Sequence, residues 1–153
     1  FNIGSLSYHI GEEDRHHGYY AVGYALGSSP SETSADKTFN YALWTLIEQP
    51  LLHVGESHLG AMWQGGTSPA SRSTCRHYWG AGLIWSNIPP QMTQVGLVVN
   101  RALYADGRET DVELTGSFPV CNHFTLQPAV HCINTNGNYT AAAQLRAILE
   151  FGN

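Results

Sequence analysis

The chain of 153 residues is long enough for one domain with a sizeable core, and nothing in it indicates a second domain. Only 12% of its residues are charged, about half of the roughly 25% that is usual in soluble globular proteins, whereas glycine (16 residues) and aromatic residues (11%) are frequent. This composition favours a closed sheet whose outside contacts lipid, with a β-sandwich as an alternative. The net charge of -5 and the lack of a Lys/Arg cluster argue against nucleic acid as a partner.

The sequence contains no run of 18 apolar residues, which excludes a transmembrane helix. If the chain spans a membrane, it must therefore do so as a β-barrel. No initiator Met or signal peptide is present, and the chain begins at once with a strand-like segment. We expect that a leader has been removed or that the chain is part of a longer polypeptide.

Polar segments divide the first part of the chain into extended stretches. Residues 1–10 alternate weakly, and residues 17–27 alternate with large apolar side chains on one face. The charged segment 11–17 is interpreted as a turn, and the Ser-rich segment 28–38 as a surface loop.

The segment 39–52 is predicted as the third strand, with a helix as the alternative for 41–49, because both of its faces carry apolar residues. Pro50 is expected to end this strand, since proline cannot donate to a ladder. A fourth strand is predicted over 57–66, followed by a polar loop over 67–74.

The segment 75–87 is predicted as a strand with Trp79 and Trp85 on the same face. The two side chains would lie about 20 Å apart along the strand. This spacing is typical of the two aromatic girdles of a membrane barrel, but two core tryptophans would give the same pattern.

Four further strands are predicted, joined by short turns. The turn signals are the Pro-containing segment 87–92, Asp106-Gly107, Asn122-His123 and Asn136-Gly137. The predicted strands are 93–106, the alternating stretch that ends at Val120, 124–133 and 138–151. Together with the earlier segments these make nine strands.

The last strand, 138–151, alternates over its whole length and has one wholly apolar face. It is about 46 Å long, enough to cross a bilayer core of about 30 Å when tilted by about 40°. The predicted fold is therefore all-β, an antiparallel transmembrane β-barrel. Nine strands leave the first residue on the side of the longer loops, as expected for part of a larger barrel.

Several motifs of the second half resemble the C-terminal half of the carbohydrate-selective porin family of Gram-negative outer membranes. They are YWGAGL (78–83), VNRA (99–102), TDVEL (110–114), LQPAV (126–130) and LRAILEF (145–151). The resemblance implies a sixteen-stranded barrel about twice this length, located in the outer membrane, of which residues 1–153 form the C-terminal part. It also implies passive diffusion of sugars and other small hydrophilic solutes.

The two faces of the strands supply the candidate site residues. The pore-lining candidates are Glu113, Gln127, His131, Gln144, Arg146 and Glu150. The lipid-facing candidates are Trp79, Trp85, Leu114, Phe118, Leu126, Tyr139, Leu145, Leu149 and Phe151.

No catalytic set is found in the sequence, so we expect a protein that is not an enzyme and has no cofactor. The eight histidines are scattered and show no metal-binding spacing, so no metal site is expected. The expected partners are sugars or small hydrophilic solutes, outer-membrane lipid, and the missing N-terminal barrel half or another chain. We expect Cys75, Cys121 and Cys132 to be free thiols.

Two other functions are compatible with the same strands. One is a soluble up-and-down barrel that binds a small ligand inside, with its apolar faces inward. The other is a structural partial barrel that pairs its exposed edges with another chain.

Overall fold

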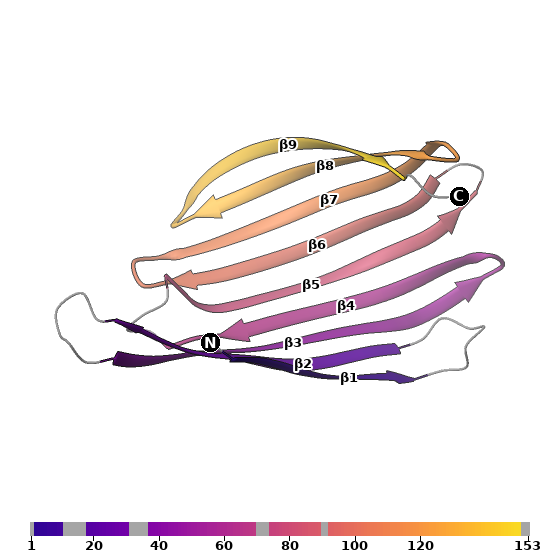
Figure 1. The fold of residues 1–153 in the computed structure, drawn as a ribbon. Helices are drawn as coiled ribbons and strands as arrows, with labels where there is room; N and C mark the ends of the chain where they lie inside the picture. Colours follow the sequence, from indigo (N-terminus) through magenta and orange to yellow (C-terminus); the bar gives the residue numbers. More distant parts are fainter. Residues whose placement is uncertain (1, 11–17, 31–36, 70–73, 90–91, 151–153) are drawn as a thin grey trace.

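The computed structural model describes residues 2–10, 18–30, 37–69, 74–89 and 92–150, which form a single antiparallel β-sheet. Each strand pairs with the next one in chain order, and the sheet is bent into a trough (Figure 1). The strands are β1 (Asn2–Ile10), β2 (Gly18–Pro30), β3 (Lys37–Val54), β4 (Ser57–Thr67), β5 (Cys75–Ile88), β6 (Met92–Tyr104), β7 (Arg108–Cys121), β8 (Phe124–Thr135) and β9 (Asn138–Leu149). The predicted all-β fold and its nine antiparallel strands are thus confirmed.

The helix alternative for 41–49 is wrong, because these residues lie within β3 and pair with β2 on one side. In the part of the chain that the structure describes, no helix is long and apolar enough to cross a membrane.

Pro50 does not end β3, contrary to expectation. It pairs with Gly60, and the register shifts directly after it, so that Leu52 is the next residue to pair with β4. A bulge of this kind lets a strand continue past a residue that has no N–H to donate.

Two predicted loops are shorter than expected. Residues 28–30 of β2 pair with residues 37–39 of β3, and Thr67 belongs to β4. The backbone ladder there continues through residues of polar type, so composition alone misplaced the strand ends. The predicted turn at 11–17 and most of the remaining loop residues, 31–36 and 70–73, lie outside the described residues.

The short hairpin at Asn136-Gly137 is confirmed. Asn136 (φ 54°) and Gly137 (φ 96°) are both in the left-handed region, as a type I′ turn requires. The side chain of Asn134 accepts a hydrogen bond from the Gly137 N–H at 2.9 Å. No disulfide joins Cys75, Cys121 or Cys132, as expected.

The ladder registers assign every strand residue to one of two faces, because directly paired residues share a face. One face carries nearly all the large apolar side chains that are exposed, the exceptions being Ile3, Trp44 and the bulge residues Leu51 and Val120. We call it the convex face, since it forms the outside of the trough. Leu114 (50% exposed) and Leu145 (67%) lie on it.

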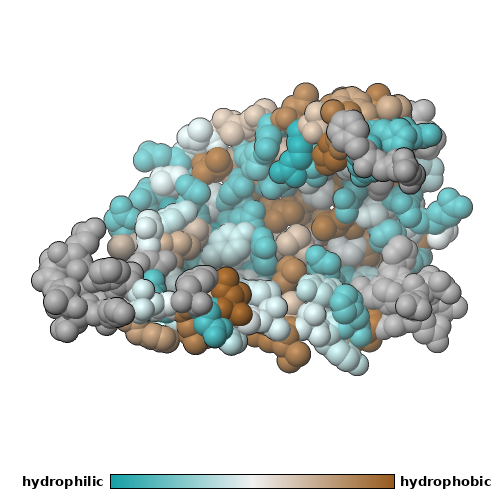
Figure 2. Space-filling view, in the orientation of Figure 1, coloured by the Kyte–Doolittle hydropathy of each residue, from teal (hydrophilic) through white to brown (hydrophobic). Residues whose placement is uncertain are grey.

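The opposite, concave face lines the trough and carries most of the polar side chains (Figure 2). The buried alanines Ala21, Ala102 and Ala129 all lie on this face, where the curvature crowds the side chains together. No described side chain is less than 2% exposed. The sheet therefore has no apolar core, and its most exposed surface is its most apolar one.

The sheet is open along both sides. Among the described residues β1 pairs only with β2, and β9 pairs only with β8. The described strands thus form an open trough, and the closure of the predicted barrel stays a prediction.

Candidate pore-lining site

Four of the six pore-lining candidates meet on the concave face of β7, β8 and β9. The ladder pairs Gln127 with Arg146 and Ala129 with Gln144, and Glu113 lies two residues from Thr115, the partner of Ala129. A shallow cavity of about 50 Å³ is lined by Glu113, Thr115, Gln127, Ala129, Gln144 and Arg146. It combines an anion, a cation and amide groups, all of which can bind hydroxyl groups.

Arg146 is oriented by its cross-strand neighbour. Its Nη1 donates a hydrogen bond to Oε1 of Gln127 at 3.3 Å. Because the guanidinium has five N–H donors in a planar fork, most of them stay available to a solute in the trough.

His131, the fifth candidate, lies in an acidic environment. Its Nδ1 is 3.1 Å from Oδ2 of Asp111, and the two side chains are 18% and 20% exposed. Glu113 is the direct ladder partner of His131. Asp111 is not among the pore-lining candidates predicted from the sequence, although its alternation with Glu113 indicates the same face.

Glu150, the sixth candidate, follows the end of β9. Its backbone N–H donates to the carbonyl oxygen of His123 at 3.0 Å, which fixes the backbone beside the β7–β8 turn. Its side chain is exposed and lies outside the cavity of the other candidates.

A second polar network on the concave face was missed at the sequence level. Nε2 of Gln64 donates to the Tyr78 hydroxyl at 2.6 Å, and that hydroxyl donates to Oδ1 of Asn100 at 2.8 Å. Gly80 leaves the space for this network, because a Cβ at this position would overlap the Asn100 side chain. The sequence indicates this network only through the polar residues on one face of β4, β5 and β6. It does not specify the register in which these strands pair.

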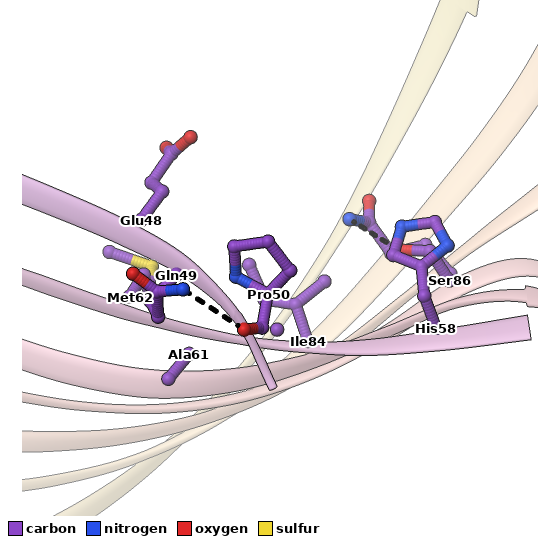
Figure 3. A pocket seen from close by; sticks show the side chains of 10 residues that line it. Glu48, Gln49, Pro50, His58, Ala61, Met62, Ile84 and Ser86 are labelled. Atoms are coloured by element: carbon purple, nitrogen blue, oxygen red, sulfur yellow. Dashed lines mark hydrogen bonds between the residues drawn. The ribbon is translucent and has the colours of Figure 1, made fainter. Parts of the chain in front are cut away.

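A larger cavity of about 270 Å³ lies at the concave surface where β3, β4, β5 and β6 meet (Figure 3). Glu48, Pro50 and His58 point into the trough there, and Nε2 of Gln94 donates to Oγ of Ser86 at 3.3 Å. Met62 and Ile84 supply apolar surface between these polar groups. This mixture of polar and apolar surface suits a sugar ring, which has polar edges and apolar faces.

The lipid-facing candidates that the structure describes all lie on the convex face. Trp79, Trp85, Leu114, Tyr139, Leu145 and Leu149 are exposed there. Phe118 and Leu126 are half-buried cross-strand partners, and Phe118 borders an apolar groove of about 260 Å³ beside Pro128. Phe151 lies outside the described residues.

Trp44 is the notable aromatic residue of the concave face. It pairs with Gly23 of β2, and its ring covers the position where a Cβ of Gly23 would stand. An aromatic ring over a strand glycine stabilises the pair, and the exposed part of the ring offers a stacking surface to solutes in the trough.

Comparison of the chain with protein-family models, curated proteins and solved structures finds no match. The resemblance to carbohydrate-selective porins therefore rests on the sequence motifs alone.

Proposed function

We propose that the chain forms part of the wall of an outer-membrane diffusion pore for sugars and other small hydrophilic solutes. This proposal rests on the exposure of the two faces, which is the reverse of that in a soluble protein: the apolar face is exposed and the polar face is more buried. Leu114 and Trp85 (50% and 49% exposed) lie on the outside, whereas Asp111 and His131 are about four-fifths buried in the trough. A continuous apolar surface is unfavourable in water and favours an apolar medium such as lipid.

The convex face has the dimensions of a membrane band. On β8 it is apolar from Phe124 to Cys132, a stretch about 30 Å long that would span about 23 Å at a tilt of about 40°. The apolar band of outer-membrane barrels is about 25 Å tall.

One ladder row at the edge of this apolar stretch has interfacial chemistry. The pairing places its members side by side across five strands: Trp79, Arg101, Thr110, Asn134 and Tyr139. Aromatic and basic side chains of this kind are favoured at the level of lipid headgroups. We assign this row to one membrane interface.

The charges of the concave face favour neutral solutes over anions. Its carboxylates are Glu48, Glu109, Asp111 and Glu113, whereas Arg146 supplies a positive charge. An excess of negative charge along a pore wall repels anions, while hydroxyl-rich neutral solutes can still exchange hydrogen bonds with the wall.

The open edges of β1 and β9 favour a wall completed by further strands, either from the other half of a larger barrel or from another chain. A soluble barrel with a ligand in an apolar interior is less well supported, because the apolar face is the convex one.

The proposal is tested by swelling of lipid vesicles that carry the protein in its native outer-membrane assembly. We expect faster swelling in glucose than in gluconate, an anion of similar size. Arg146→Gln should slow gluconate further, because it removes positive charge from the trough. Arg101→Gln, on the convex face, is the matched control and should leave the ratio of the two rates unchanged. Swelling no faster than that of protein-free vesicles contradicts the pore, and equal rates for the two solutes contradict the selectivity.

A further inference from the structure

We infer that Asp111 and Glu113 of β7 and His131 of β8 form a binding site for a divalent transition-metal ion on the concave face. One ligand atom of each residue can be chosen so that all three lie within 4.8 Å of one another. The site is independent of solute diffusion, since it depends only on the geometry of two neighbouring strands.

The backbone brings the three side chains together. Glu113 and His131 are direct ladder partners, and Asp111 stands two residues from Glu113, so that all three point to the same face. The residues are therefore neighbours in every side-chain rotamer. Strand geometry, rather than a sequence motif, creates the set, which is why the spacing of the histidines along the chain did not reveal it.

The distances suit a small metal ion. Ligand atoms about 2.1 Å from a tetrahedral zinc ion are about 3.4 Å apart. Nδ1 of His131 and Oδ2 of Asp111 are already 3.1 Å apart. Glu113, which stands directly opposite His131, offers a carboxylate oxygen within 4.8 Å of a ligand atom of each of the other two residues, so this side chain has to move closer when an ion binds.

The Asp111 carboxylate supplies a second, independent observation. Its Oδ1 is buried and makes no hydrogen bond, while its Oδ2 contacts His131. Buried carboxylate oxygens normally have a donor or a cation, because burial without one costs free energy. The ladder neighbours on the β6 side, Asn100 and Val98, carry no charge. Arg146 of β9 lines the same cavity as Glu113, and its hydrogen bond goes to Gln127.

The ligand types indicate which ions bind. The imidazole nitrogen among the ligands favours zinc and similar transition-metal ions, with the two carboxylates and water completing the coordination. Calcium and magnesium prefer sites made of oxygen ligands alone. We therefore expect Zn²⁺ and Co²⁺ to bind more tightly than Ca²⁺ or Mg²⁺.

The experiment is titration of the purified native assembly with Zn²⁺ by calorimetry, and with Co²⁺ by visible absorption. We expect one site per chain and a Co²⁺ d–d band. His131→Ala and Glu113→Gln should each weaken binding by at least about 10-fold, the lower end of the effect of disturbing a metal site. His123→Ala, in the turn between the same two strands, is the matched control and should bind like the native protein.

Acidification should also weaken binding, because an imidazole must lose its proton to coordinate a metal. Unchanged Zn²⁺ affinity in His131→Ala overturns the inference. Equal affinities for Ca²⁺ and Zn²⁺ in the native protein would also overturn it, because the imidazole would then have no effect on which ion binds. Neither readout involves solute flux, so failure of this site and failure of the pore are distinguishable.

Discussion

At the scale of single residues, adjacent positions have opposite surroundings. Gln144 and Leu145 are neighbours in β9, yet Gln144 borders the concave cavity with Arg146 and Leu145 points outward. The effect of a substitution thus depends on the face it falls on more than on how exposed the position is.

Under the proposed function, we expect Leu145→Arg to lower the free energy of unfolding by about 2–4 kcal/mol, the cost of a cationic side chain near the bilayer midplane. Gln144→Arg is the matched control and should have little effect, since the trough is hydrated. Urea unfolding of both variants in lipid vesicles measures the difference. Equal losses in the two variants would show that the faces are wrongly assigned.

Alternation in the sequence was enough to assign faces to the candidate residues that the structure describes in strands. It could not predict which polar groups meet. The contact between Asp111 and His131 depends on the register of two strands, and the sequence does not specify this register because a one-residue shift leaves each strand's own pattern intact.

At the scale of strands, three of the four prolines within the described strands stand at irregularities of the ladder, and Pro30 is the exception. Pro50 and Pro119 each stand beside a register shift. Beside Pro128 the β7–β8 ladder has a gap, with no pairs between Thr115–Ala129 and Phe118–Leu126. Oγ1 of Thr115 donates a hydrogen bond to the Pro128 carbonyl oxygen at 3.1 Å. The expectation that Pro50 ends its strand failed because a bulge, which depends on the neighbouring strand, has no signal in a single strand.

The pairing of β2 with β3 depends on Gly23. We expect Gly23→Ala to lower the free energy of unfolding by about 1–3 kcal/mol, because the added methyl group would overlap the Trp44 ring and displace it. The measurement is urea unfolding in lipid vesicles, followed by Trp fluorescence.

Gly60→Ala is the matched control for this substitution. A Cβ at Gly60 would meet its nearest atom, the carbonyl oxygen of Gln49, at an ordinary 3.6 Å. This variant should be unchanged, or more stable by up to about 1 kcal/mol through the lower entropy of its unfolded state. A loss equal to that of Gly23→Ala would contradict the role of the Trp44 contact.

At the scale of the whole molecule, the sheet of described strands has two open edges, one on β1 and one on β9. Under the proposed function these edges cannot face lipid, because each unsatisfied backbone group costs several kcal/mol there. The order of the strands could be predicted from the turn signals, but curvature and closure could not, because they depend on pairing between distant strands.

We therefore expect the protein extracted from membranes in mild detergent to be heavier than a single chain of 16.7 kDa. The added mass should come from a polypeptide that pairs with β1 and β9. Native mass spectrometry measures it directly. A membrane-inserted monomer of this mass would contradict the proposed assembly.

The convex face has a further consequence for how this sequence can change. It has no described layer of protein packed against it, and under the proposed function its neighbours are lipid chains, which are fluid and have no fixed shape. Exchanges among Leu, Val and Phe at positions such as Leu97 or Leu114 should therefore be nearly neutral, whereas the crowded positions around Ala102 and Ala129 tolerate only small side chains. Under the proposed function, shape therefore constrains the residues of the trough, whereas hydrophobicity alone constrains those of the outside.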